Sequence, residues 1–323
     1  MKIQKRLIAE FEMQSYTQII FPHENTDWVE YLQEAEETFI NIINAIRKHQ
    51  KCLVVCKDVN AVKQHFNDAK NLTFIAYETD DTWARDCSAL SIEENGKKKL
   101  LDFTFNAWGG KFISQKDNAM THALTPNAVK CDFVLEGGAI ESNGVDTILT
   151  TSACIFNKNR NPHLKQEEII DTLKQYFGAS KILVLKSGYL VGDDTDSHID
   201  TLARFIDKKT IMYVQCCEKT DEHFYALRLM EKELQCIAKE ENYTLIALPM
   251  ADAIYFQEER LPATYANFLF VNGAVLVPVY GVKSDTLAIN IFKNSFKNHK
   301  IIPINCATLI KQHGSLHCVS MNM

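Results

Sequence analysis

Five polar stretches along the chain contain the residue types that carry out chemistry. Each combines acids, imidazoles or a thiol with turn-forming residues, and each adjoins a strand-like run. They cover residues 82–86, 135–138, 192–200, 267–281 and 313–318. Taken singly, an acid-rich run is more often a solvated turn, and a cysteine beside a histidine is more often a buried thiol. Their recurrence at the same place in the strand pattern favours one shared site.

A thiol, an imidazole and several carboxylates together suit attack on a guanidinium group. Its carbon is a poor electrophile because the cation is delocalised and stays protonated at physiological pH. Carboxylates hold such a planar cation by paired hydrogen bonds, and a cysteine thiolate supplies a strong nucleophile. A histidine can protonate the departing ammonia and then activate water, while an acid orients it. This chemistry needs no cofactor and no metal ion, and we expect neither.

Amphipathic helices and short strands must position these stretches. Apolar residues at helical spacing predict a helix over 27–49, capped by Thr26 or Asp27. Three more helices are predicted at 170–177, 224–237 and 287–292, the first ending at Gly178.

Strand-like runs recur at intervals of roughly fifty to sixty residues, a period typical of a repeated supersecondary unit. The runs lie at 73–76, 133–135, 182–185, 244–248 and 301–304, with further runs at 88–92, 147–151, 210–215, 271–279 and 316–320. No linker or low-complexity tract separates them. We therefore expect one α/β domain over residues 1–323, made of five similar modules whose polar stretches meet at a common axis.

Composition narrows the class of protein. Hydrophobic residues make up 46% and charged residues 24% of the 323 residues, the mix of a soluble globular protein with a sizeable core. A net charge of −6 argues against nucleic acid as a partner. The apolar run 268–282 is too short to span a bilayer, so no membrane partner is expected. Ten cysteines without C-x-x-C pairs fit a reducing cytoplasm.

The motifs resemble those of the agmatine deiminases, a branch of the peptidylarginine deiminase-like, guanidino-group-modifying superfamily. The likeness extends over nearly the whole chain. It is carried by Trp-Ala-Arg-Asp at 83–86, Asn-Ala-Trp-Gly-Gly-Lys-Phe at 106–112, Glu-Gly-Gly at 136–138, Asn-Arg-Asn-Pro-His-Leu at 159–164 and His-Ile-Asp at 198–200. The resemblance implies a five-fold pseudosymmetric α/β propeller of ββαβ-type modules. It also implies conversion of agmatine and water to N-carbamoylputrescine and ammonia, in putrescine biosynthesis.

The resemblance also implies the residue roles. Cys318 would be the nucleophile that forms a covalent thiouronium intermediate. His198 would act as general acid and then as general base, and Glu136 would orient it. We expect a small cationic guanidino substrate and a homo-oligomer.

Substrate binding would involve acids and one aromatic ring. By the same resemblance, Asp86 and Asp200 would clamp the guanidinium, and Trp83 would pack along the substrate methylenes. The acid-rich stretch adds Asp194 and Asp196 on the substrate side, where acids favour an amine tail over a carboxylate.

Two departures from the family pattern lie in loops that shape the pocket. Ser88-Ala89 replaces the usual Gly-Pro, and 313–316 is less glycine-rich than the family's approach to the nucleophile. Alternatives are a deiminase of free or peptidyl arginine and a non-catalytic propeller that binds a polyamine. A metal site at His317 and Cys318 is disfavoured because adjacent strand residues face opposite sides, which also predicts a packing role for His317.

Overall fold

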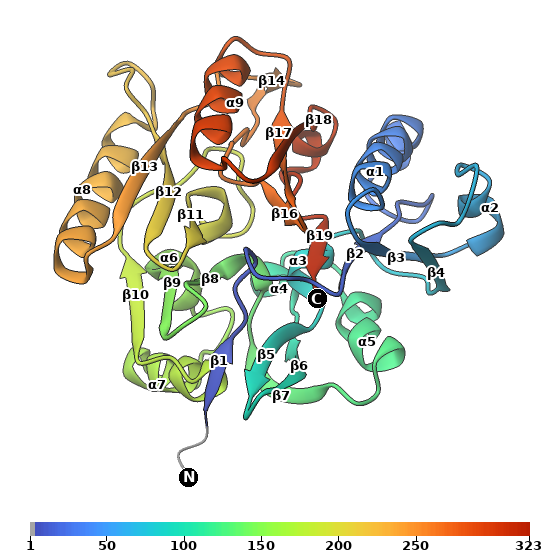
Figure 1. Cartoon of the computed structure of the whole chain (residues 1–323), viewed down its shortest axis with the longest axis horizontal. Coiled ribbons are helices and arrows are strands. Elements are labelled where there is room, and N and C mark those ends of the chain that lie inside the picture. The colour runs from blue at the N-terminus through green and yellow to red at the C-terminus, as the bar shows by residue number, and fades with distance from the viewer. Residues whose placement is uncertain (1–3) are drawn as a thin grey trace.

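The computed structural model describes residues 4–323 and has a mixed α/β fold. Four sheets share one construction: two antiparallel strands are followed by a helical connection and a third strand parallel to the second. The chain thus repeats a ββαβ unit, as the strand spacing predicts. The sheets are arranged around the middle of the molecule, and the long helices lie toward its rim (Figure 1).

The first two units follow one another in the N-terminal half. Their elements are β5 (Leu90–Glu94), β6 (Lys97–Thr104), α4 (Ala107–Gly110), α5 (Gln115–Leu124) and β7 (Val129–Val134), then β8 (Ile140–Ser142), β9 (Thr147–Thr151), α6 (Ser152–Ile155), α7 (Gln166–Phe177) and β10 (Lys181–Leu185). Strand β1 (Lys5–Leu7) adds to the free edge of β5. Helix α7 ends at Gly178, whose φ of 62° is left-handed, as predicted for a C-terminal cap.

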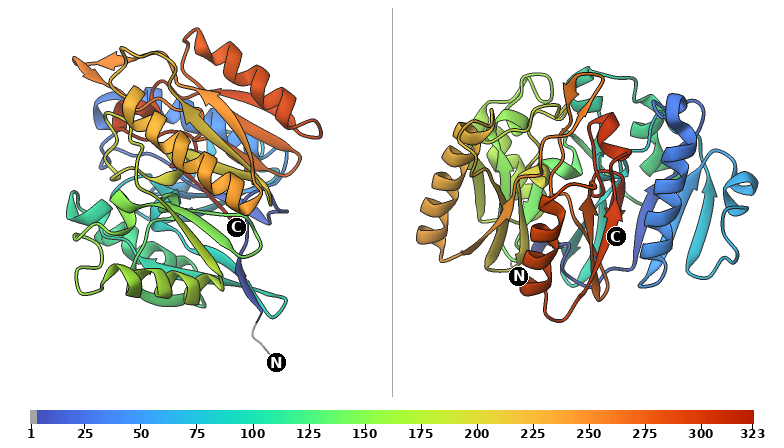
Figure 2. Two further views of the ribbon diagram at one scale, coloured as in Figure 1. Left: turned by 90° about the vertical axis from the view of Figure 1, so that its left-hand side faces the viewer. Right: turned by 90° about the horizontal axis from the view of Figure 1, so that it is seen from above.

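The next two units have the same order. Their elements are β11 (Ala203–Asp207), β12 (Thr210–Gln215), α8 (Phe224–Glu241) and β13 (Thr244–Pro249), then β16 (Leu269–Val271), β17 (Ala274–Val279), α9 (Ser284–Ser295) and β18 (Lys300–Asn305). A small ribbon of β14 (Tyr255–Phe256) and β15 (Glu259–Arg260) lies between them in the chain. Figure 2 shows α8 and α9 on the outside of their sheets.

The last sheet is assembled from both ends of the chain. Strand β19 (Ser320–Asn322) pairs antiparallel with β2 (Tyr16–Ile20), which is parallel to β3 (Lys51–Cys56) and, through it, to β4 (Leu72–Ala76). Helix α1 (Leu32–Ile46) joins β2 to β3, and α2 (Val59–Lys63) joins β3 to β4. The N-terminal and C-terminal segments of the chain are therefore joined in one sheet. Five-fold symmetry of the units stays a prediction.

Two local predictions are wrong. Helix α1 begins at Leu32 after a 3₁₀ turn, η1 (Val29–Tyr31), and neither Thr26 nor Asp27 caps it, since the N-cap positions are Trp28 for the 3₁₀ turn and Tyr31 for α1. The strand expected at 316–320 is mostly a turn, and β19 starts only at Ser320.

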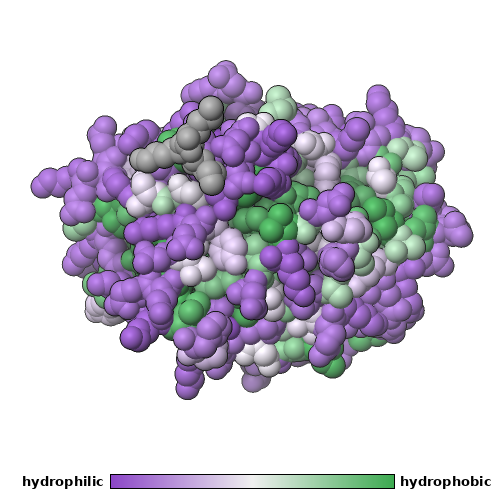
Figure 3. Space-filling view, turned by 90° about the horizontal axis from the view of Figure 1, so that it is seen from below, coloured by the Kyte–Doolittle hydropathy of each residue, from purple (hydrophilic) through white to green (hydrophobic). Residues whose placement is uncertain are grey.

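A large apolar core runs through the sheets and the inward faces of the helices. Phe39, Ile42, Ile43 and Ile46 of α1 are fully buried, which confirms the apolar stripe over this part of the helix, whereas Val29, at its predicted start, is exposed. Seen from below, the surface is mainly hydrophilic with scattered apolar areas (Figure 3). Within the described part of the chain, no helix combines the length and the apolar character that crossing a membrane demands.

The polar stretches lie in one structural position. Short helices α3 (Ala84–Cys87), η2 (Gly137–Ala139) and η3 (Ile199–Thr201) precede β5, β8 and β11, the first strands of three units. Asn267 stands just before β16, and Cys318 just before β19. Helix α3 contacts η2 and β19, and η2 contacts η3. The repeat therefore gathers chemically active side chains from distant parts of the sequence.

Candidate active site

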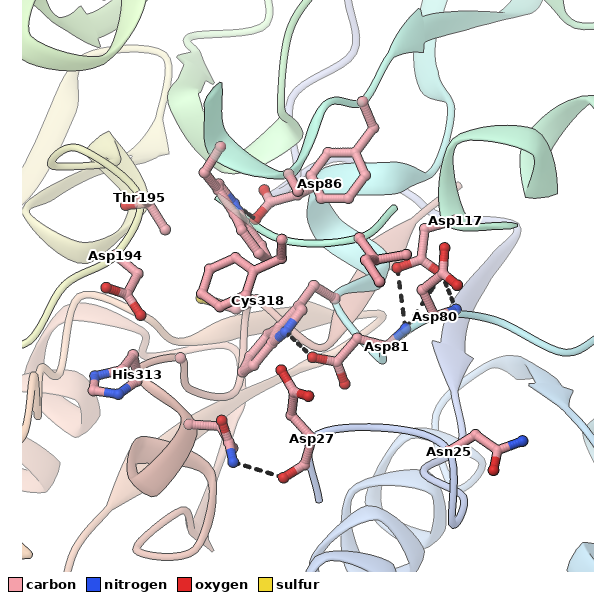
Figure 4. A pocket seen from close by; sticks show the side chains of 18 residues that line it. Asn25, Asp27, Asp80, Asp81, Asp86, Asp117, Asp194, Thr195, His313 and Cys318 are labelled. Carbon is pink, nitrogen blue, oxygen red and sulfur yellow. Dashed lines mark hydrogen bonds between the residues drawn. The ribbon is translucent and has the colours of Figure 1, made fainter. Parts of the chain in front are cut away.

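A cavity of about 530 Å³ opens over the gathered stretches (Figure 4). Its wall includes Trp83, Asp86, Trp108, Asp194 and Cys318. The cavity is therefore lined by both a thiol and carboxylates, with indole rings between them. His198, Asp200, Glu136 and Asp196 are not part of its wall.

Cys318 is held at the cavity by an amide side chain. Its backbone N–H and its thiol both point to Asn267 Oδ1, at 3.3 and 3.4 Å. The side chain is buried, and this burial, with the negative charges of Asp200 and Asp86, raises the pKa of the thiol well above its usual range. Without a cation nearby, Cys318 is a neutral thiol.

Asp86 is fixed by two donors. Its Oδ1 accepts from the Gly138 N–H and its Oδ2 from Trp108 Nε1, both at 3.0 Å. Burial raises its pKa to about 6, an effect that nearby Asp200 adds to and that His198 opposes. Asp86 is therefore an oriented, ionised carboxylate at neutral pH, at the wall of the cavity.

His198 lies between two carboxylates. Its Nδ1 is 3.7 Å from Asp86 Oδ1 and its Nε2 is 3.9 Å from Glu136 Oε2. Burial lowers its pKa, but Asp86, Cys154 and Glu136 outweigh burial and raise the pKa to about 10. Neither ring nitrogen has a hydrogen-bond partner among residues 4–323. His198 is thus an imidazolium with protons available for transfer.

Gly138 lets three functional groups converge. A Cβ atom at this position would lie 2.6 Å from His198 Nδ1 and 3.0 Å from both Asp200 Oδ2 and Asp86 Oδ1. At Gly137, a Cβ would lie 2.3 Å from the Arg85 carbonyl oxygen. The two glycines therefore allow neighbouring groups to approach closely.

Glu136 is fully buried and paired with Arg160. Arg160 Nε lies 2.9 Å from each Glu136 carboxylate oxygen, and its NH1 donates to Asp196 Oδ2 at 2.7 Å. Asp196 also accepts from Lys111 Nζ at 2.9 Å. The substrate-binding role expected for Asp196 is therefore corrected: its carboxylate is engaged by two cations and helps to hold Arg160. Asp194 does line the cavity.

His317 belongs to a buried polar network, so the prediction of a packing role is wrong. Its Nδ1 is hydrogen-bonded to Asp200 Oδ2 and its Nε2 to Glu10 Oε1, each at 2.7 Å. Glu10 in turn pairs with Arg85 and Arg204. The backbone here is a turn, so strand alternation does not apply. One oxygen of Asp200 is engaged by His317, and Oδ1 has no partner within the described residues.

Trp83 forms one wall of the cavity, as expected for an aromatic contact with substrate. Its Nε1 donates to Asp81 Oδ2 at 2.7 Å, and its ring meets Trp28 and Trp108 at centroid distances of 5.8 and 6.3 Å. A Cβ on Gly314 would lie 2.0 Å from Trp83 Cζ3. The absence of a side chain at Gly314 therefore leaves room for the Trp83 indole.

Several site residues had little or no signal in the sequence. Trp108 and Arg160 lie in the quoted motifs, and Asn267 begins the fourth stretch, but nothing assigned them a partner. Cys154 carried no signal at all. Glu136, Cys154 and His198 place possible metal ligand atoms within 4.8 Å of one another. Because Arg160 already engages both Glu136 oxygens, this cluster suits hydrogen bonding and proton transfer better than a cation.

Comparison with known proteins gives full-length matches. A sequence profile of the Porphyromonas-type peptidyl-arginine deiminase family matches residues 6–323. A cysteine-to-serine variant of the C. jejuni agmatine deiminase, solved with substrate bound, is 42% identical, with a TM-score of 0.95 over 99% of this chain and 96% of that chain. The agmatine deiminase of Enterococcus faecalis is 26% identical, with a TM-score of 0.91 over 98% of this chain and 95% of that chain.

Proposed function

The chain belongs to the Porphyromonas-type peptidyl-arginine deiminase family, and from that premise we propose that it hydrolyses agmatine to N-carbamoylputrescine and ammonia. The observation that carries the proposal is that Cys318 and Asp86 line the same cavity. A nucleophile and a carboxylate at one surface are what attack on a bound guanidinium needs. The names of the similar solved structures support the choice of agmatine.

Binding of the cation prepares the nucleophile. The guanidinium would be held by Asp86 and by the unpartnered oxygen of Asp200. These two carboxylates are also charges that raise the pKa of Cys318, so pairing them with a cation lowers that pKa. The thiol proton is released to solvent, and the thiolate is then formed where the electrophilic carbon lies.

His198 gives and takes the protons of the leaving ammonia and the attacking water in the remaining steps. Cys318 Sγ bonds to the guanidinium carbon, and the C–N bond breaks as the imidazolium of His198 gives its proton to the leaving ammonia. The covalent product is a thiouronium ion. Neutral His198 then takes one proton from water, whose oxygen attacks the same carbon. As the C–S bond breaks, the proton of the new hydroxyl passes to Cys318 Sγ, which restores the thiol and releases N-carbamoylputrescine with a neutral urea group. Glu136, fixed by Arg160, stabilises the imidazolium at both stages.

The broader expectations are part of the same proposal. We propose a cytoplasmic homo-oligomer of five-fold propeller subunits that serves putrescine biosynthesis, without a cofactor or metal ion. The repeated ββαβ units support the propeller.

A deiminase of free or peptidyl arginine is the second candidate, favoured by the name of the matching family. The cavity wall argues against free arginine, because the described residues that form it include Asp27, Asp81 and Asp194 but no lysine or arginine to receive a carboxylate.

Ammonia release from agmatine, L-arginine and a blocked arginine amide distinguishes these functions. We expect agmatine to have the highest kcat/KM, and Cys318→Ser to abolish turnover while agmatine still binds. An equal or higher kcat/KM for arginine or its amide would replace the proposed substrate. Tight polyamine binding without ammonia release by the unaltered protein would identify a binding protein instead.

A further inference from the structure

The cavity has two acidic sides. They differ in whether a cation of the protein already lies beside their acidic residues. Figure 4 shows Asp27 and Asp81 together on one side and Asp194 with His313 on the other. Agmatine carries a primary ammonium at the end of a tetramethylene chain. Only one of the two sides needs to receive this ammonium, so the difference between them bears on specificity.

One of the two carboxyl oxygens of Asp81 has no hydrogen-bond partner among the described residues. Its Oδ2 accepts from Trp83 Nε1 at 2.7 Å, whereas its Oδ1 is shielded from solvent and has no partner among the described side chains and backbone groups. Its backbone N–H donates to Asp117 Oδ2 at 3.1 Å, which fixes the position of the residue. A buried oxygen without a donor is costly unless a ligand supplies one.

The charges that raise the pKa of Asp81 are negative. Burial raises the pKa of Asp81 to about 8, and the neighbouring carboxylates of Asp27 and Asp117 add to this effect, so without a ligand Asp81 is mainly a protonated acid at neutral pH. No salt bridge to Asp81 or Asp27 occurs within residues 4–323, and the hydrogen bond from the Trp83 indole opposes the rise in the pKa of Asp81. An incoming ammonium would lower this pKa, so Asp81 would ionise on binding and its unpartnered oxygen would accept the hydrogen bond it lacks.

A cation lies behind the opposite side, outside the cavity wall. Lys111 Nζ donates to the carbonyl oxygen of Asp194 and to the carboxylate of Asp196. A second ammonium beside Asp194 would meet this charge. Trp83 connects the Asp81 side with the reactive residues. Its indole nitrogen is bonded to Asp81, and its ring lines the same cavity as Cys318 and Asp86.

We propose that Asp81, assisted by Asp27, binds the terminal ammonium of the substrate and sets the preference for a guanidino compound with an amine tail. This rests on the proposed function. The guanidinium lies at Asp86 and Cys318, the methylenes pass along Trp83, and the ammonium ends at the free oxygen of Asp81.

The test compares agmatine with n-butylguanidine, which has the same guanidinium and chain but no ammonium. The measured quantity is the ratio of kcat/KM for agmatine to kcat/KM for n-butylguanidine, from ammonia release. We expect Asp81→Asn to lower this ratio by about 30-fold or more, chiefly through KM for agmatine, the scale of one charge-assisted contact. Asparagine can still accept from Trp83, so the indole stays in place. Asp132→Asn removes an exposed carboxylate elsewhere and is the matched control.

Two outcomes overturn the inference. One is an unchanged ratio in Asp81→Asn, and the other is a ratio that collapses in Asp194→Asn but not in Asp81→Asn. If Asp81→Asn does not fold, the test uses Asp27→Asn. Because Asp27 is exposed, this substitution should lower the ratio by only about 3- to 10-fold. An unchanged ratio then refutes the inference. Absence of ammonia release from agmatine by the unaltered protein would instead refute the proposed function.

Discussion

Substitution of Asp86 by asparagine tests the guanidinium clamp with little change in shape. Asp86 is only 4% exposed and accepts two hydrogen bonds, from Gly138 N–H and Trp108 Nε1. An asparagine oxygen can keep one of these, so the fold should survive. What is lost is the negative charge that would face the bound guanidinium.

The expected loss is large because the pair is shielded from water. Removing one partner of a buried charge pair costs about 3 to 5 kcal/mol. Since about 1.4 kcal/mol corresponds to a factor of ten, agmatine affinity should fall by roughly two to four orders of magnitude. Asp200 remains and keeps part of the attraction, which places the result toward the lower end of that range.

Calorimetry on a Cys318→Ser background measures this loss without turnover. The comparison is between Cys318→Ser alone and Cys318→Ser combined with Asp86→Asn, each checked for folding by circular dichroism. Asp132→Asn on the same background makes the same charge change on the surface and should leave Kd within about 3-fold. Tight agmatine binding by the Asp86 double variant would remove that residue from the clamp, and the reasoning about Cys318 activation would fail with it.

Three other predictions follow from contacts in the site. Gly314→Ala places a methyl group where Trp83 now lies, so KM for agmatine should rise by about tenfold or more, and an unchanged KM would mean that the indole is free to move. Arg160→Gln leaves Glu136 buried without its cation and should lower the free energy of unfolding by about 3 to 5 kcal/mol; an unaltered urea midpoint would contradict this. The pKa of Asp86, raised by burial to about 6, means that this carboxylate is neutral below and charged above that pH, so kcat/KM should increase as pH rises through about 6. A flat acid limb would show that binding does not depend on this ionisation.

The sequence predicts the repeated unit well because its signals are local. Apolar periodicity and strand-like composition identify α1, α7, α8 and α9 and most of the strands. The common position of the polar stretches, just before the first strand of each unit, also follows from that pattern. Boundaries are less predictable, since a 3₁₀ turn precedes α1 and the spacing of apolar residues does not distinguish it from an α-helical turn.

The partners of the polar residues could not be predicted from spacing. Asp196 looks like a substrate ligand in an acid-rich run, but its charge is taken by Arg160 and Lys111, which lie 36 and 85 residues away in the chain. His317 looks like a packing residue, but a turn directs it to Asp200 and Glu10. Ion pairing across units depends on three-dimensional placement, and a linear pattern contains little of that information.

The arrangement of charge explains how a reactive thiol can be both buried and controlled. Asp86 and Asp200 hold the pKa of Cys318 high, so the free protein presents a weak nucleophile to other electrophiles. In the proposed reaction, the ligand that neutralises these carboxylates is the same guanidinium that the thiolate attacks. His198, whose pKa is raised by its carboxylate neighbours, would keep its proton until ammonia leaves. Reactivity is therefore coupled to the presence of the correct cation, and a neutral analogue of the guanidinium should bind without activating Cys318.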